Sequence, residues 1–117
     1  EPLGPVVRHG DNQWEDIVRW TVFALIQAEE SGVTAANADA MVKNPPNPDV
    51  ARMLGAEGDL GAMLGLDKAW AIRAIKAAGN YGEIFEHNLG TKTPIGLERG
   101  MNAQYTNGGL QYAPPFR

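Results

Sequence analysis

The sequence predicts a mainly α-helical fold with at most one short strand, and three observations support this. Apolar residues recur at helical spacing over residues 12–31. Residues that commonly cap helix N-termini stand directly before several later segments. The 14 glycines and 8 prolines divide the rest of the 117 residues into short elements joined by turns. This length fits one domain and is too short for two of ordinary size.

Residues 1–11 are predicted to form a short strand and a turn. Val6 and Val7 favour a strand over residues 5–9, and the prolines at positions 2 and 5 restrict it to a sheet edge or a strand start. Gly10 and Asp11 then favour a turn. The chain begins at Glu1 without a methionine, which favours a processed chain or a piece of a longer one.

Residues 12–31 are predicted to form one long helix, capped at its start by Asp11 or Asn12 and ended by Gly32. Helical spacing places one set of apolar residues on a single face: Trp14, Ile17, Val18, Thr21, Leu25 and Ala28. Other apolar residues lie outside that face: Trp20, Val22, Phe23 and Ile26. A helix that is apolar nearly all round is normally covered on two sides. The pattern therefore predicts a packing layer that this chain does not itself supply.

Residues 32–117 are predicted to form short helices and a tail. Thr34, Asn47 and Asp67 are expected to cap helices that end near residues 42, 54 and 78. Glycines between positions 55 and 65 predict turns, with one helical turn at residues 60–64. Further helices are expected at residues 83–88 and 94–105, the second held by Ile95, Leu97 and Met101. Residues 110–117 should form an irregular tail because two prolines interrupt them.

Aromatic residues are assigned to packing, because at helical spacing they belong more often to a core than to a ligand site. The residues assigned to the core are Trp14, Trp20, Phe23 and Trp70. In the helix that includes Trp70, packing is also expected from Ala74, Ala77 and Ala78, with Ile72 and Ile75 to either side, whereas Lys68, Arg73 and Lys76 face water. The residues expected to anchor the tail on the body are Tyr105, Tyr112 and Phe116.

The composition excludes several kinds of chemistry. A chain without cysteine has no disulfide, no thiolate metal site and no thiol catalysis. A net charge of −4 argues against a nucleic-acid partner. The glycine spacing matches neither a dinucleotide-binding fingerprint nor a phosphate-binding loop.

The histidines and paired carboxylates do not assemble a catalytic site. His9 lies beside a glycine turn and is expected at the surface. His87 and Glu83 share a helix face, but a zinc site needs three or four ligands, so a solvated pair is expected. The carboxylate pairs at residues 15–16 and 29–30 cannot face each other across a cleft. The second pair opposes the helix dipole and needs water or a cation nearby. We therefore assign no catalytic, ligand-binding or metal-ligating residue and expect no cofactor.

Four stretches together resemble one family. Residues 1–14 read EPLGPVVRHGDNQW, which resembles the segment after the last crossing between lobes in periplasmic amino-acid-binding proteins. Residues 54–61 (LGAEGDLG), 79–86 (GNYGEIFE) and 108–117 (GGLQYAPPFR) narrow this resemblance to the general L-amino-acid-binding proteins of ABC transporters. The resemblance spans essentially the whole chain.

This resemblance implies a two-lobed α/β protein of the periplasm that binds an L-amino acid in its cleft and delivers it to a membrane permease. The chain would be the C-terminal third, in which residues 1–11 return to the first lobe, residues 12–31 form a long helix, and residues 32–117 form a helical extension and tail. Most family residues that grip the ligand lie upstream, so none is carried over to this chain. The chain on its own is expected to bind amino acids weakly or not at all.

The resemblance also implies that the separate chain exposes apolar surface. We expect it to self-associate and to bury Trp20, Phe23 and Ile26. An alternative interpretation is a self-standing helical module for protein interaction, without catalytic activity. An enzyme is the least favoured, because no polar partner for His87 is evident.

Overall fold

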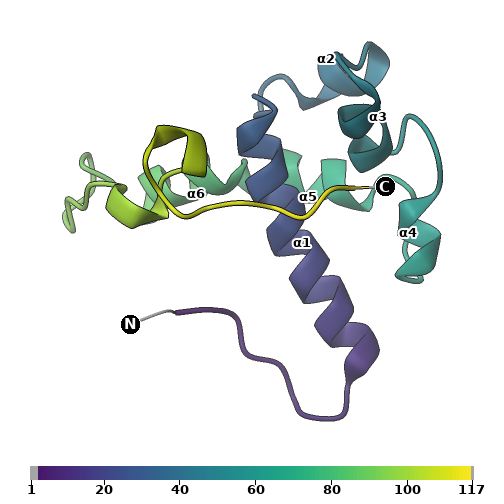
Figure 1. Cartoon of the computed structure of the whole chain (residues 1–117), viewed down its shortest axis with the longest axis horizontal. Coiled ribbons are helices and arrows are strands. Elements are labelled where there is room, and N and C mark those ends of the chain that lie inside the picture. The colour runs from purple at the N-terminus through teal and green to yellow at the C-terminus, as the bar shows by residue number, and fades with distance from the viewer. Residues whose placement is uncertain (1–2, 117) are drawn as a thin grey trace.

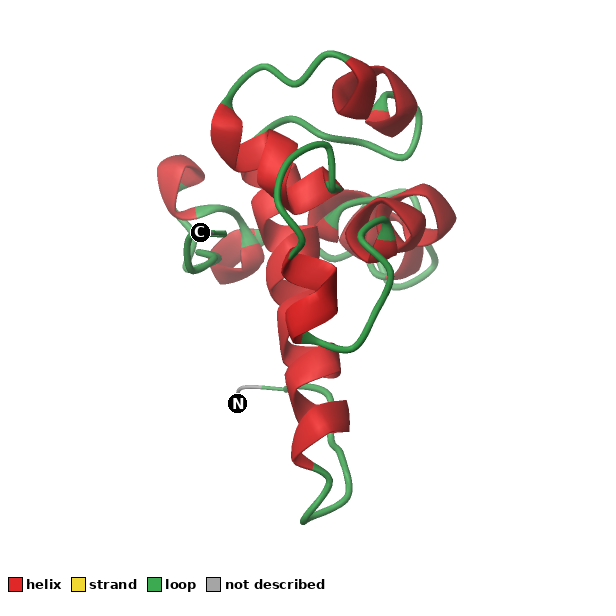
Figure 2. Ribbon diagram, turned by 90° about the vertical axis from the view of Figure 1, so that its right-hand side faces the viewer, coloured by secondary structure: helices red, strands yellow, loops and turns green. Residues whose placement is uncertain are grey.

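The computed structural model describes residues 3–116 as six α-helices and two short 3₁₀ helices. These residues contain no strand; Gln104 and Gln111 form an isolated parallel bridge. Figure 1 shows α1 (Asn12–Glu30) as a long helix with most of the shorter helices gathered around its C-terminal half. In Figure 2 the N-terminal end of α1 extends beyond the other helices. The predicted mainly helical fold is confirmed. Among the described helices, none combines the length and apolar character needed to cross a membrane.

The α1 helix forms where the sequence predicts it, and ends one residue earlier than expected. The Asp11 side chain accepts a hydrogen bond from the backbone N–H of Trp14 at 3.2 Å and so caps the helix start. At the other end Ser31 donates its N–H to the last turn, and Gly32 then redirects the chain with a φ of 70°. Local capping chemistry therefore determines both ends of this helix.

Of the second and third helices, only the third begins at the residue that the sequence predicts. α2 (Ala38–Lys43) starts later than predicted because Thr34 and Asn37 bond each other's backbone in a turn. The Asn37 side chain accepts from the N–H of Thr34 at 2.7 Å, and the Thr34 hydroxyl accepts from the N–H of Asn37 at 3.2 Å. α3 (Pro48–Leu54) has its predicted bounds, with Asn47 as the N-cap.

The next three helices complete the body of the molecule. α4 (Leu60–Met63) is the predicted single turn. α5 (Trp70–Ala78) begins two residues late because Asp67 closes a turn, its side chain accepting from the N–H of Ala69 at 2.8 Å. α6 (Tyr81–Asn88) begins two residues earlier than predicted. Both α5 and α6 pack against α1.

The helix predicted over residues 94–105 does not form. Only the two 3₁₀ helices, η1 (Gly100–Asn102) and η2 (Tyr105–Asn107), occur in the described chain after residue 91. The Thr93 hydroxyl accepts hydrogen bonds from the N–H groups of Ile95 and Gly96 at 3.3 and 3.4 Å, and such local bonds compete with a helix. The side chains expected to hold this helix on the body are instead exposed: Ile95 by 58%, Leu97 by 48% and Met101 by 68%.

The strand predicted over residues 5–9 is also absent: residues 3–8 form a loop. A strand needs a neighbour for its backbone hydrogen bonds, and within residues 3–116 no other strand is present to pair with it. Leu3 is 89% exposed and Val6 94%. Glu1 and Pro2, in the predicted strand-and-turn segment, and Arg117, in the predicted tail, lie outside the described residues.

The hydrophobic core lies between α1, α3, α5 and the C-terminal tail. Its largest fully buried side chains are Met53, Leu54, Ile75, Val33 and Val50. Trp70 and Phe116 also enter the core, and the irregular tail is confirmed up to residue 116. In α5 Ile72 is buried and Arg73 and Lys76 are exposed, as predicted. The predicted packing of Ala77 and Ala78 is wrong, because both face solvent.

The buried face of α1 differs from the one that helical spacing predicted. Ala24 and Ala28 are fully buried, whereas Trp14 at the projecting end is 52% exposed. Ile26, expected outside the buried face, is only 5% exposed. Small side chains at positions 24 and 28 let the neighbouring helices approach closely. The predicted face was therefore right at Ala28 and wrong at Trp14, and it left out the buried Ile26.

Two aromatic predictions for the tail also need correction. Tyr105 and Tyr112 do not anchor it on the helices, because they are 52% and 59% exposed. Their rings pack edge to face on each other, with centroids 5.3 Å apart. Phe116, at 3% exposure, is the aromatic residue of the tail that reaches the core.

Candidate functional site

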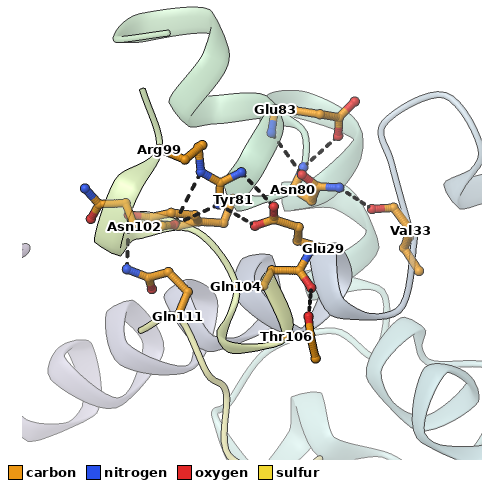
Figure 3. Close-up of polar contacts among 10 residues, drawn as sticks. All are labelled: Glu29, Val33, Asn80, Tyr81, Glu83, Arg99, Asn102, Gln104, Thr106 and Gln111. Carbon is orange, nitrogen blue, oxygen red and sulfur yellow. Dashed lines mark hydrogen bonds and ion pairs between the residues drawn. The ribbon is translucent and has the colours of Figure 1, made fainter. Parts of the chain in front are cut away.

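A polar cluster joins the end of α1, the start of α6 and the chain around η1 (Figure 3). At its centre the Arg99 guanidinium donates two hydrogen bonds to the Glu29 carboxylate, at 2.7 and 3.0 Å. The two side chains are only 20% and 12% exposed. Arg99 also donates to the carbonyl of Asn102 at 2.8 and 3.3 Å. The sequence predicts water or a cation beside residues 29–30, and Arg99 is a cation paired with Glu29.

Two aromatic rings and a glycine shape the space around this ion pair. The guanidinium of Arg99 lies 5.6 Å from the ring centre of Tyr81 and 5.4 Å from that of Phe85. A Cβ on Gly82 would lie 2.6 Å from the Glu29 carboxylate and 2.9 Å from the Arg99 guanidinium. The absence of a side chain at Gly82 thus lets α6 approach the end of α1.

The start of α6 is held by a capping box. The Asn80 side chain accepts from the N–H of Glu83 at 2.9 Å, and the Glu83 carboxylate accepts from the N–H of Asn80 at 2.8 Å. Asn80 is 6% exposed, and its side-chain amide donates to the carbonyl of Val33 at 2.8 Å. The Asn-x-x-Glu spacing at residues 80–83 is visible in the sequence and would have predicted the observed helix start.

The prediction that Glu83 and His87 form a solvated pair is wrong for Glu83. Its carboxylate is part-buried and accepts hydrogen bonds from the backbone of Asn80 and, at 3.1 Å, of Ala35. His87 is exposed on the last turn of α6, and His9 is exposed in its turn, as predicted. Glu83 therefore fixes backbone structure on two elements.

Glu30 lies beside this cluster and has an altered acidity. Burial raises the pKa of its carboxyl above the ordinary value of 4.5. A hydrogen bond from the backbone of Ala113 lowers this pKa in part, and the neighbouring Glu29 carboxylate raises it further. The ionised form of Glu30 is therefore disfavoured in the folded chain.

The chemistry of the cluster suits a structural role, in which it holds α1, α6 and the chain around η1 together. Its charges are paired, and no buried side-chain nitrogen or oxygen within the described part of the chain lacks a hydrogen-bond partner. Residues 3–116 contain no group of three histidine, aspartate or glutamate side chains placed to hold a metal ion. The role of Arg99 was not predicted from the sequence, because its partner Glu29 lies 70 residues away.

The projecting half of α1 presents a different kind of surface. A groove of about 240 Å³ runs between this half and the N-terminal loop. It is lined by Pro5, Val7, Glu15, Val18, Arg19, Val22 and Phe23. Arg19 and Glu15 pair across one helical turn at its edge. This surface is mostly apolar, and it is the part of α1 that the other helices leave uncovered (Figure 2).

Comparison with known proteins identifies the class to which these features belong. The chain is homologous to the C-terminal part of the periplasmic binding proteins of amino-acid ABC transporters. It is 62% identical over 117 residues to the glutamate/glutamine/aspartate/asparagine-binding protein BztA of Rhodobacter capsulatus. It is 59% identical over 119 residues to the general L-amino acid-binding periplasmic protein AapJ of Rhizobium johnstonii. Both matches include all of this chain and 35% of the relative. No family model matches the chain.

A solved structure agrees with this assignment. The ABC transporter periplasmic binding protein from Brucella ovis with glutathione bound superposes with a TM-score of 0.88 at 55% identity. The match covers 95% of this chain and 35% of that protein. The chain thus spans about a third of the length of the relatives it matches. These matches confirm the resemblance seen in the sequence and do not favour the alternative of a self-standing interaction module.

Proposed function

We propose that this chain is part of a periplasmic protein that binds L-amino acids and delivers them to an ABC permease. The observation that carries the proposal is an identity of 55–62% over the whole chain with amino-acid-binding relatives. On this proposal the amino acid binds only in the larger protein, nucleic acid is not a partner, and the protein is not an enzyme. The saturated hydrogen bonding of the Arg99 cluster supports a structural role for this part of the protein.

The division of the chain follows from the same proposal. Residues 1–11 return to the first lobe, residues 12–31 form the helix that packs on it, and residues 32–117 form a helical extension and tail. The apolar groove beside α1 and the mostly exposed loop of residues 3–8 support this division. The side of α1 that the other helices leave open is then the side that meets the lobe.

An uptake assay tests the proposal. In R. capsulatus, this chain replaces the matching C-terminal part of BztA, and uptake of labelled L-glutamate is compared with strains that carry intact BztA or none. We expect the chimera to restore uptake to within a few-fold of intact BztA, because the exchanged parts are 62% identical. A chimera that is exported and folded but supports no uptake above the strain without BztA would refute the proposed function.

A further inference from the structure

The C-terminal segment of residues 103–116, here called the strap, crosses α1 and is attached to the helices at separate points (Figure 1). Past its midpoint the Gln111 side chain donates to the hydroxyl of Tyr81 in α6 at 3.4 Å. Further along, Ala113 is 3% exposed. At its end Phe116 is 3% exposed. With the contacts of Phe116 described next, the strap touches four helices, α1, α3, α5 and α6, which come from distant parts of the sequence.

Phe116 makes the most extensive of these attachments. Its ring centre lies 5.4 Å from that of Trp20 in α1, edge to face, and 6.5 Å from that of Trp70 in α5, nearly stacked. Its carbonyl accepts a hydrogen bond from Arg52 of α3 at 3.1 Å. One residue thus links three helices.

The rest of the strap is bonded mainly to itself and to the adjoining turn. Tyr105 donates its N–H to the carbonyl of Gln111, Gln111 to that of Ala103, and Gly109 to that of Gln104, at 3.0 to 3.1 Å. Tyr112 and Leu110 are 59% and 67% exposed. A segment with internal hydrogen bonds and few contacts to its surroundings can open as a unit below the free energy of global unfolding.

An apolar hollow lies directly beside Phe116. It has a volume of about 230 Å³, and Phe116 forms one of its walls. The other lining residues are Asp16, Trp20, Leu60, Met63, Leu64 and Trp70. Withdrawal of the Phe116 ring would join the space it fills to this hollow and expose both tryptophans. The closed strap therefore conceals a groove between α1 and α5.

We propose that the strap is a latch. It opens and closes as one unit on folded helices, and the buried Phe116 side chain holds it closed. Opening exposes the apolar groove between α1 and α5 and closing buries it. This device is separate from the amino-acid binding proposed above, because it involves only contacts within residues 16–116. It accounts for a buried aromatic side chain at the end of a segment in which Leu110 and Tyr112 are exposed.

Hydrogen exchange of the protein with Phe116→Ala tests the latch, with Tyr112→Ala on the exposed part of the strap as the matched control. We expect amides of the strap to exchange at least about tenfold faster in Phe116→Ala, while amides of α3 and α6 keep their rates. Binding of the dye 1-anilinonaphthalene-8-sulfonate should increase in Phe116→Ala and not in Tyr112→Ala. Equal acceleration in all helices, or no acceleration in the strap, would overturn the proposal.

Arg52→Gln provides a milder variant that leaves the Phe116 ring in place, in case Phe116→Ala fails to fold. It removes the hydrogen bond between the Arg52 side chain and the Phe116 carbonyl. We expect a smaller acceleration, roughly threefold, again confined to the strap. Strap exchange that is unchanged in this variant, or faster exchange that also extends through α6, would count against the latch.

Discussion

Arg99 and Glu29 form the most buried ion pair in the described chain, and Arg99 also donates to the carbonyl of Asn102. Removing one partner leaves the other charge largely out of water. Arg99→Gln should therefore lower the free energy of unfolding by about 2–4 kcal/mol, as measured by urea denaturation. The matched control is Arg19→Gln, which breaks an exposed pair one helical turn apart and should cost about 0.5 kcal/mol or less. Equal losses in the two variants would contradict this account of the cluster.

The raised pKa of Glu30 makes stability depend on pH. Burial, the largest cause, makes the folded protein bind a proton at Glu30 more tightly than the unfolded chain does. The resulting stabilisation is fully present below pH 4.5 and is lost as pH rises through the folded pKa. Ionised Glu30 at pH 7 therefore opposes folding.

Glu30→Gln tests this sign, because glutamine stays neutral and its carbonyl can still accept from the Ala113 backbone. We expect Glu30→Gln to raise the free energy of unfolding at pH 7 and to have a smaller effect in acid. Urea denaturation at several pH values provides the measurement, with Glu57→Gln at an exposed position as the control. A variant that is less stable than the wild type at pH 7 would show that the sign is wrong.

Among the elements, α6 depends most on one cap. Asn80→Ala removes the side chain that accepts from Glu83 and donates to the Val33 carbonyl. We expect a loss of about 2 kcal/mol, because a cap is lost and a buried carbonyl loses its partner. Thermal or urea denaturation measures it. Asn88→Ala, in the exposed last turn of the same helix, should change stability by less than about 0.5 kcal/mol.

Elements with local signals were predictable from the sequence. α3 has its predicted bounds because Asn47, Pro48 and Gly55 specify its two ends within the segment itself. The helix predicted over residues 94–105 failed because apolar spacing says nothing about whether a core is available to cover those side chains. The predicted strand at residues 5–9 failed for the related reason that its pairing depends on a neighbour elsewhere.

The candidate site was less predictable from the sequence than the fold. The sequence predicted water or a cation near residues 29–30, but no local pattern could select Arg99, which lies 70 residues from Glu29. α6 can approach this pair only because Gly82 has no side chain. The sequence does not show which residues Gly82 faces, because they become its neighbours only when the helices pack. Long-range pairing is set by tertiary structure, and one sequence does not encode it in a local pattern.

At the scale of the whole molecule, the surface available for self-association differs from the one first expected. Ile26 is buried within the chain, and Trp20 packs on Phe116. Of the three residues expected there, only Phe23 lines the groove on the uncovered side of α1, together with Val18 and Val22. We expect the separate chain to associate through this side, and Val18→Glu to reduce association.

Light scattering at micromolar concentrations measures this association. The expected result is a mass that increases with concentration for the original chain and stays nearer that of a monomer for Val18→Glu. A control substitution, Lys68→Glu, lies on an exposed position away from the groove and should leave the association unchanged. A monomer at all concentrations for the original chain would exclude this interface.

The central claim is that this chain completes an amino-acid-binding protein and does not bind the amino acid alone. Isothermal titration calorimetry with L-glutamate tests it most directly, applied to the separate chain and to the BztA chimera that contains it. The account predicts binding of one L-glutamate per chimera and no measurable binding to the separate chain. Tight, stoichiometric binding by the separate chain would contradict it, and so would a folded chimera that binds no L-glutamate.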